Sequence, residues 1–159
     1  MSKRDALRIL QGRLSERLQS ARTQGTSAAW LAVQARDKRY LLPLSHSGEI
    51  FAWTPPQRVP YTRPWFLGVS NLRGALYGVA DLAAYLSEAT GSPNAGPSPV
   101  KADSRLVALN NVLEVNCALL VDRLLGLKHV DSFARSDSVE PGGAACLSAR
   151  FTDPQGQTW

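Results

Sequence analysis

The residues of this chain whose types and spacing could do chemistry are few, and the richest group is a short stretch around Arg73. Asn71, Arg73 and Gly74 lie between two mostly apolar runs, residues 65–69 and 75–79, a pattern typical of a tight connection between two paired strands. Gly74 can take a positive φ without penalty. Arg73 on such a turn would present a planar fork of donors to a carboxylate, either on a partner or within the fold. The alternative is a surface arginine without a role.

Groups that could perform catalysis are scarce in the sequence. The two histidines, His46 and His129, lie in different halves of the chain, and neither has a ligand-like neighbour. Asp81 and Asp122 could in principle pair across a cleft as acid and base. Each fits a structural role better, Asp81 as a helix cap and Asp122 as the end of an apolar strand. Zinc-ligand spacing and a phosphate-binding glycine loop are both missing, so the sequence predicts a protein that is not an enzyme and needs no cofactor or metal.

Length and charge narrow the class of protein. A chain of 159 residues fits one domain or two small intertwined halves with a core of their own. The net charge of +5 is concentrated in residues 1–22, which hold six Lys and Arg residues against two acidic ones, whereas the rest holds twelve against eleven. Binding to phosphates needs cations focused on one surface of the folded module. A small β-barrel that binds single-stranded nucleic acid through this basic arm and the aromatic residues is kept as the alternative function.

The sequence also indicates the cellular compartment of the protein. Cys117 and Cys146 lie far apart, so we expect free thiols in a reducing environment and no disulfide. The longest apolar runs are far shorter than the roughly 20 residues of a membrane-spanning helix, and the first residues lack the pattern of a signal peptide. We therefore expect a cytoplasmic protein without direct membrane insertion.

The first element expected is an amphipathic helix over residues 3–20. Its leucines recur at spacings of three and four and so share one face: Leu7, Leu10, Leu14 and Leu18. Packing of this stripe on the body of the protein, or on a second copy, is favoured over binding to a membrane surface, because no large aromatic residue anchors the stripe. Residues 22–27 follow as a linker.

The remaining chain has the spacing of an all-β protein. Asp81 offers an N-cap for a short helix that Gly91 would end. Residues 92–99 and 132–143 are expected to be loops, since they are polar and rich in proline or glycine. The expected strands are residues 29–35, 39–44, 49–53, 66–70 and 75–80 before the helix, and residues 105–109, 115–121, 124–130 and 145–151 after it.

Residues 68–82 resemble the central signature of CheW-like coupling proteins, which join chemoreceptors to a histidine kinase of the CheA type. The resemblance lies in Gly-Val-Ser-Asn-Leu-Arg-Gly followed by an apolar strand that ends in Asp-Leu. Further matches fall in the same order as in the family: Gly48-Glu49-Ile50, Val59-Pro60 and Pro64 upstream, and residues 118–122 downstream. The residues around Trp53, Pro60, Trp65 and Trp159 are most similar to the PilI branch, which serves twitching motility by type IV pili.

The resemblance implies a fold of two small five-stranded, SH3-like β-barrels. The CheW-like domain would cover residues 28–159, with the first barrel at about 28–91 and the second at about 100–159, after an N-terminal basic helix and linker over residues 1–27. In the family, a last strand follows a tryptophan like Trp159 and closes the barrel. Its absence here predicts a partial chain with an unpaired sheet edge, which could recruit another copy.

The resemblance further implies a non-catalytic adaptor. It would join the cytoplasmic tip of a chemoreceptor to a CheA-like kinase at membrane-bound receptor arrays, without binding nucleic acid. An apolar groove would accept a receptor helix, with Arg73 and Glu49 at its rim, and a second face would bind the kinase. The residues expected to contact receptor or kinase are Leu72 and Arg73 first, then Glu49, Asn71 and Gly74, and also Gly68.

Overall fold

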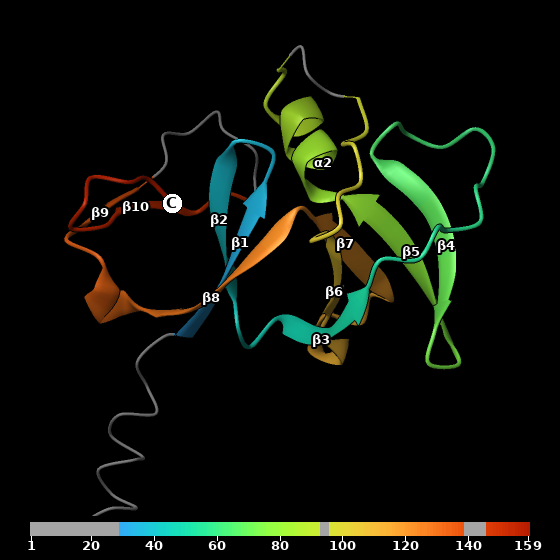
Figure 1. Cartoon of the computed structure of the whole chain (residues 1–159), viewed down its shortest axis with the longest axis horizontal. Helices are drawn as coiled ribbons and strands as arrows, with labels where there is room; N and C mark the ends of the chain where they lie inside the picture. The colour runs from blue at the N-terminus through green and yellow to red at the C-terminus, as the bar shows by residue number, and fades with distance from the viewer. Residues whose placement is uncertain (1–28, 93–95, 139–145) are drawn as a thin grey trace, which may run out of the picture.

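The computed structural model of the protein describes residues 29–92, 96–138 and 146–159 (Figure 1). The expected helix over residues 3–20 lies outside the described residues. The described elements are mostly strands, with one α-helix and two short 3₁₀ helices. In chain order they are β1 (Ala29–Ala35), β2 (Lys38–Pro43), β3 (Ser47–Ala52), β4 (Phe66–Leu72), β5 (Ala75–Asp81), α2 (Leu82–Ala89), β6 (Arg105–Leu109), η1 (Asn111–Leu113), β7 (Cys117–Val121), β8 (Arg123–His129), η2 (Val130–Ser132), β9 (Arg135–Ser138) and β10 (Ala149–Thr152).

The strands form three sheets, with the strand orders β3-β6-β7-β5-β4, β2-β1-β8 and β10-β9. All named strand pairs are antiparallel except β5 and β7, which run parallel with Gly78 opposite Cys117. Strands from both sides of residues 92–99 share the two larger sheets, because β3 pairs with β6 and β1 pairs with β8. The sequence therefore predicted the strands well but not how they combine.

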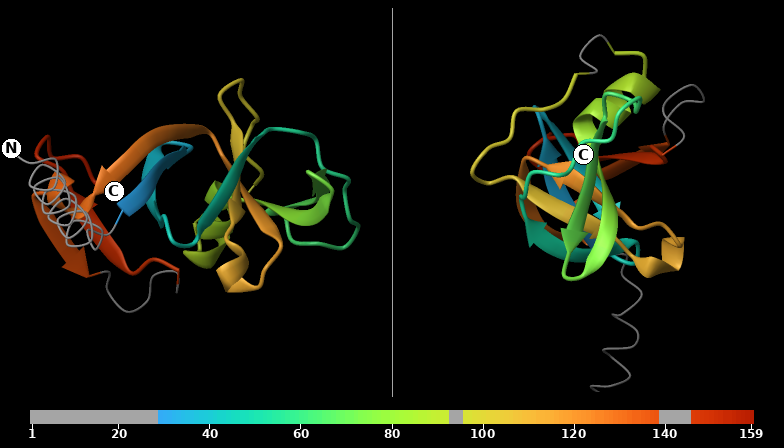
Figure 2. Two further views of the ribbon diagram at one scale, coloured as in Figure 1. Left: turned by 90° about the horizontal axis from the view of Figure 1, so that it is seen from below. Right: turned by 90° about the vertical axis from the view of Figure 1, so that its right-hand side faces the viewer.

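The two small five-stranded barrels expected from the resemblance are not closed in the part of the chain that the structure describes. One five-stranded sheet is present, and the segment after its edge strand β3 meets the other edge strand, β4, through an isolated bridge between Gln57 and Val69. The strands expected for the second barrel are distributed over all three sheets, with β6 and β7 in the five-stranded sheet, β8 in the three-stranded sheet, and β9 and β10 in the two-stranded sheet (Figure 2). Closure depends on contacts between residues far apart in the chain, which local patterns do not specify.

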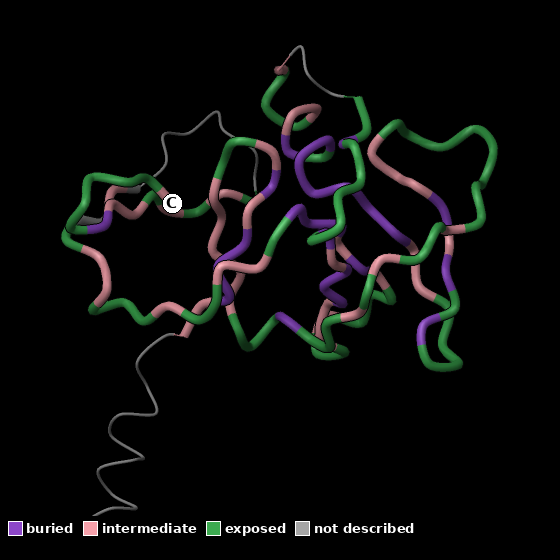
Figure 3. The backbone as a smooth tube through the Cα atoms, viewed as in Figure 1, coloured by how far each residue is buried: buried purple, intermediate pink, exposed green. Residues whose placement is uncertain are grey.

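The core has two parts. One lies inside the curved five-stranded sheet and contains Leu72, Val79, Leu106, Ala118 and Leu120. The other lies under α2, where Leu82 and Leu86 pack against side chains of β1, β6 and β7. The buried residues accordingly concentrate along β1, α2 and the middle of the five-stranded sheet (Figure 3). Helix α2 thus packs over the region where the two larger sheets meet.

The predicted cap of α2 is confirmed. The Asp81 carboxylate accepts a hydrogen bond from the backbone N–H of Ala84 at 3.1 Å, and Asp81 itself has the extended backbone of an N-cap. At the other end Thr90 is the C-cap, and Gly91 follows with a φ of 66°. This helix start fixes the end of β5, because the cap residue is also the last residue of that strand.

The expectation of a loop over residues 132–143 is wrong in part, because β9 lies within it. This strand reads Arg-Ser-Asp-Ser, which has no apolar alternation, and it pairs with β10 with Asp137 opposite Arg150. After β10 the chain turns at Asp153 and returns, so that the backbones of Trp159 and Phe151 exchange hydrogen bonds of 2.8 and 3.1 Å. The helices described here include none with the length and apolar character that crossing a membrane requires.

Candidate functional site

The turn between β4 and β5 has the geometry that its sequence predicts. Arg73 and Gly74 have φ values of 49° and 86°, and two positive φ values in a two-residue loop are typical of a type I′ hairpin. The Asn71 side-chain oxygen accepts a hydrogen bond from the Gly74 backbone N–H at 2.8 Å. Asn71 and Gly74 therefore hold the turn that projects Arg73.

Arg73 forms an ion pair with Glu49 of β3. Its guanidinium also lies over the ring of Phe51, 6.0 Å from the centroid. The two charged side chains are 76% and 43% exposed, so the guanidinium keeps most of its surface open to solvent. The contact within the fold orients Arg73 without using up its capacity to bind a second carboxylate.

Leu72 lies directly beneath this pair. It is only 5% exposed and belongs to the core cluster inside the five-stranded sheet. Its side chain therefore anchors the hairpin in the core. That Leu72 contacts a partner stays a prediction. In the free protein its buried side chain positions the β4–β5 hairpin.

Gly68 lies away from the turn, near the other end of β4. Its φ is 136°, and a Cβ at this position would lie 2.1 Å from the carbonyl oxygen of Gln57. Gln57 and Val69 exchange two backbone hydrogen bonds of 2.7 and 2.9 Å at this crossing. Gly68 thus allows the chain after β3 to approach β4 closely, which is a structural requirement.

Of the six residues expected to bind a partner, five gather at the hairpin: Glu49, Asn71, Arg73 and Gly74 at its surface and Leu72 in the core beside it. Sequence reasoning missed the exposed apolar residues that flank them. Leu76 on β5 is 62% exposed, and the register of β4 with β5 sets it opposite Asn71 of the hairpin. Val112 on η1 is also exposed, and η1 lies at the same lower end of the sheet as the hairpin (Figure 1). The available signal was Val112, an apolar residue outside the predicted strands and helix.

The two carboxylates considered as a catalytic pair have structural partners. Asp81 accepts hydrogen bonds from the Ser98 backbone and hydroxyl as well as from Ala84. Asp122 accepts from the Arg36 backbone N–H at 3.2 Å and pairs with Lys101 at 2.7 Å. These contacts tie the segment before β6 to the ends of β1 and β5. Both carboxylates are buried, and neither lines the main groove of the described structure.

Other potentially reactive groups are also placed in structural surroundings. Burial raises the pKa of the Cys117 thiol, which keeps it protonated and poorly nucleophilic at neutral pH. Within the described part of the chain, no three His, Cys, Asp or Glu side chains come together as metal ligands would.

The tryptophans do not form a platform for stacking bases. Trp53 packs against the core of the five-stranded sheet, and Trp65 meets the ring of Tyr85 edge-on at 5.2 Å. Trp30 contacts Phe151 at 5.8 Å, and Trp159 contacts Phe133 at 6.2 Å. Rings engaged with one another cannot stack successive bases. The arrangement does not favour the nucleic-acid alternative.

Comparison with known proteins agrees with this fold and surface. Residues 29–157 match the CheW-like domain. The chain is 29% identical over 108 residues to Protein PilI of Pseudomonas aeruginosa, which covers 67% of this chain and 55% of that protein. It is 35% identical over 65 residues to a probable chemotaxis protein CheW of Rhizobium etli, which covers 41% of this chain and 42% of that protein. The matched regions span about half the length of these curated relatives.

The fold is also similar to the crystal structure of the scaffolding protein TtCheW from Thermoanaerobacter tengcongensis. The TM-score is 0.64 at 19% identity, and the match covers 82% of this chain and 86% of that one. At this identity the likeness concerns the fold alone. The domain match covers most of the chain and includes the β4–β5 hairpin and its Glu49 partner, and the chain therefore belongs to the CheW-like domain family.

Proposed function

We propose that this protein is an adaptor that couples a chemoreceptor to a CheA-type histidine kinase, in a chemosensory system that controls twitching motility by type IV pili. CheW-like scaffolding proteins are non-catalytic, so the protein acts through the geometry of its contacts. The similarity to PilI supports the pilus branch of this proposal. The protein would work in the cytoplasm, beside receptor arrays at the membrane.

The observation that carries the proposal is the exposed Arg73 guanidinium, held by Glu49 beside apolar surface. A receptor tip that is a helix bundle would offer one apolar stripe and flanking carboxylates. Leu76 supplies apolar contact beside the hairpin, and Arg73 supplies the donor fork for a carboxylate. Charge pairing at the edge of such a surface sets the register of the bound helix.

The test is direct binding of a purified receptor-tip fragment and, separately, of a CheA-type kinase to the full chain. Arg73→Ala should weaken one of these interactions by about 1–3 kcal/mol, the loss expected for a charge-assisted contact at an interface. Leu76→Asp should weaken the same interaction, because a charge would then be buried against apolar surface. Isothermal titration calorimetry measures both affinities.

The matched control is Arg123→Ala. Arg123 is also exposed and paired with a carboxylate, that of Asp103 at 3.2 Å, but it lies at the start of β8. This variant should bind receptor and kinase as the parent chain does. If Arg73→Ala is folded and binds both partners with unchanged affinity, the hairpin is not the docking surface.

A further inference from the structure

A segment of residues 96–104, here called the strap, runs past α2 to the start of β6 (Figure 1). Ser98 is the only buried residue among residues 96–103, and Pro97, Pro99 and Val100 are exposed. The strap therefore places no apolar side chain in the core, and polar contacts hold it on the protein.

The first anchor of the strap is Ser98. Its backbone N–H and its hydroxyl both donate hydrogen bonds to the carboxylate of Asp81, the last residue of β5, and the bond from the hydroxyl is 3.1 Å long. The Ser98 hydroxyl oxygen accepts a bond of 3.2 Å from Nε of Arg36, and Nη2 of the same guanidinium donates to the Gly96 carbonyl oxygen. Ser98 thus connects a cation from the β1–β2 turn to a carboxylate that is only 1% exposed.

The second anchor of the strap is Lys101. Its ammonium group lies 2.7 Å from a carboxylate oxygen of Asp122, and its backbone N–H donates to the Ser104 hydroxyl at 2.9 Å. The same Asp122 oxygen accepts a hydrogen bond of 3.2 Å from the Arg36 backbone N–H. Asp122 lies between β7 and β8, where the chain passes from the five-stranded to the three-stranded sheet. The two anchors therefore meet at Arg36, at the corner between these sheets.

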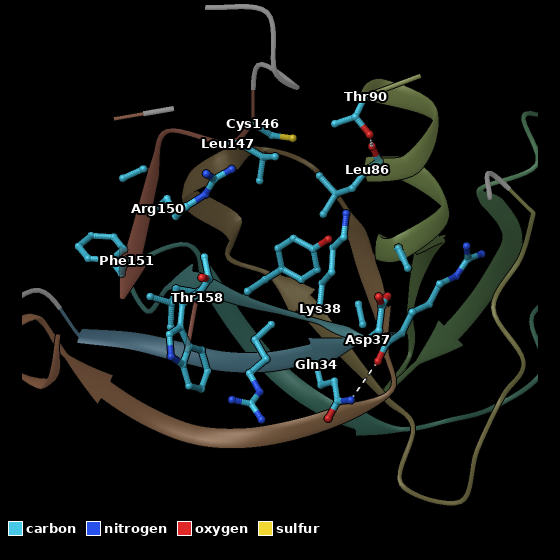
Figure 4. A pocket seen from close by; sticks show the side chains of 18 of the residues that line it. Gln34, Asp37, Lys38, Leu86, Thr90, Cys146, Leu147, Arg150, Phe151 and Thr158 are labelled. Atoms are coloured by element: carbon cyan, nitrogen blue, oxygen red, sulfur yellow. Dashed lines mark hydrogen bonds between the residues drawn. The ribbon is translucent and has the colours of Figure 1, made fainter. Parts of the chain in front are cut away.

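Arg36 occupies a backbone position that is unfavourable for arginine. It is the first of the two residues between β1 and β2, and its φ is 58°. Glycine, asparagine and aspartate are favoured there, because a larger side chain is strained at positive φ. The Arg36 carbonyl oxygen accepts a bond of 2.9 Å from the side-chain amide of Gln34, which lines the groove seen in Figure 4. The contacts of the guanidinium with the strap give this residue a function that offsets its strain.

The two larger sheets are joined independently of the strap. Among the described residues, the apolar cluster under α2 takes its buried side chains from β1, α2, β6 and β7, and none from the strap. Apolar burial is the main favourable term in folding, whereas partly exposed polar contacts contribute less. Loss of the strap contacts should therefore leave this cluster in place.

We propose that the strap is a latch, which opens as one unit while both larger sheets stay folded, and that the Arg36 side chain holds it closed. Pro97 and Pro99 restrict the backbone on both sides of Ser98, so the strap keeps an extended form and is released as a whole. Opening uncovers the two carboxylates that anchor the strap and frees the connection between α2 and β6. The latch thus controls how firmly this corner of the protein is held, and it does not depend on binding of a receptor or a kinase.

Native-state hydrogen exchange of the full chain, followed by NMR spectroscopy, tests whether the strap opens separately from the rest of the fold. The Ser98 and Lys101 amides should exchange through a common opening that low concentrations of urea hardly change, because this opening exposes little surface. The amides of β6, which is paired on both sides, should exchange through a larger opening that urea promotes strongly.

The variant Arg36→Gly separates opening of the latch from global stability. It removes the guanidinium contacts and relieves the strained φ, while the backbone bonds of residue 36 to Asp122 and Gln34 can still form. Trypsin cleavage after Lys101, which requires an open strap, should become about tenfold faster, as expected for the loss of hydrogen bonds from a charged group. The melting temperature should equal or exceed that of the parent chain.

Ser98→Ala and a matched control locate the effect. Ser98→Ala should also accelerate cleavage, and combining it with Arg36→Gly should give less than the product of the two single effects, because both remove the same bond. The control is Glu114→Gly. Glu114 is also exposed and has a φ of 52°, but it lies in the turn after η1, so its replacement should change the cleavage rate less than about twofold.

Mass spectrometry of the fragments measures cleavage after Lys101, and circular dichroism measures the melting temperatures. The proposal is overturned if the Ser98 and Lys101 amides exchange only by global unfolding, or if Arg36→Gly leaves the cleavage rate unchanged. It is also overturned if Arg36→Gly lowers the melting temperature and accelerates exchange of all amides equally, because the contacts would then belong to the fold as a whole.

Discussion

Arg73 and Glu49 form an ion pair although they come from opposite sides of the five-stranded sheet. Glu49 lies on β3 at one edge, and Arg73 lies in the turn that joins β4, at the other edge, to β5. The sheet must curl for the two to meet, and Phe51 of β3 accordingly packs toward Tyr77 of β5 at 6.3 Å between ring centroids. The pair therefore reports on the curvature of the sheet as well as on the surface that we assign to partner binding.

A double-mutant cycle on Arg73→Ala and Glu49→Ala should give a small coupling in stability. Both side chains are substantially exposed, and exposed pairs of this kind contribute about 0.2–1 kcal/mol to the free energy of unfolding. Urea unfolding of the four proteins measures the coupling. A coupling energy of several kcal/mol would mean that Arg73 serves the fold first, and its assignment to partner binding would lose its basis.

Replacement by alanine should lower the free energy of unfolding by very different amounts at Gly68, in β4, and at Gly74, in the β4–β5 turn. At Gly68 a Cβ would lie 2.1 Å from a backbone oxygen, so Gly68→Ala should lower the free energy of unfolding by more than about 3 kcal/mol. At Gly74 a Cβ would have nothing within 4 Å, so only its positive φ is penalised, by about 1 kcal/mol. Denaturant titration compares the two variants. Equal effects would contradict the close crossing of the chain at Gly68.

The pair of buried Asp122 and exposed Lys101 should matter more than a pair in which both side chains are exposed. Asp122→Ala leaves the Arg36 backbone N–H without its partner, and we expect a loss of about 1–3 kcal/mol in the free energy of unfolding. Asp103, which pairs with Arg123 at the surface, is the matched control, and Asp103→Ala should cost less than about 0.5 kcal/mol. If the two variants melt at the same temperature, the Asp122 contacts do not hold this segment in place.

Asp153 should make the C-terminal turn sensitive to acid. Burial raises the pKa of this carboxyl, but hydrogen bonds from the Trp159 indole and from the Gln157 and Gln155 backbones outweigh burial, so the pKa lies below its usual value. A lowered folded-state pKa means that the stabilisation is present above the unfolded-state pKa of about 3.9 and is lost as the pH falls through the folded-state pKa.

The comparison that tests this is thermal melting of the parent chain and Asp153→Asn between pH 7 and pH 2. The parent should melt at the higher temperature at neutral pH, and the difference between the two should shrink as the acid protonates Asp153. A difference that stays constant over this range would show that the charge on Asp153 has no part in the turn.

Features that depend on residues close together in the sequence could be predicted, and features that depend on distant residues could not. The cap of α2 by Asp81 and the turn held by Asn71 and Gly74 both join groups three residues apart, and both were predicted. The parallel pairing of β5 with β7 joins residues about forty positions apart, and no local pattern specifies it. Strand β9 was missed because its polar residues form a strand only through pairing with β10.

Within the candidate site, too, some features could be predicted from the sequence and others could not. Glu49 and Arg73 could be named from the sequence, and the structure brings them together. Leu72 was expected to contact a partner, and the structure buries its side chain in the core, in line with the alternation of buried residues along β4. Leu76 lies in a strand that was predicted, but its exposure depends on which face of the sheet covers the core, so the local pattern did not identify it.

The measurement that tests the adaptor function most directly is a three-component retention assay. A chemoreceptor tip fragment is fixed to beads, a CheA-type kinase is added, and the kinase retained is measured with and without this chain. The account predicts retention that depends on the chain, falls with Arg73→Ala and is unchanged with Arg123→Ala. Equal kinase retention with and without the folded chain would contradict it.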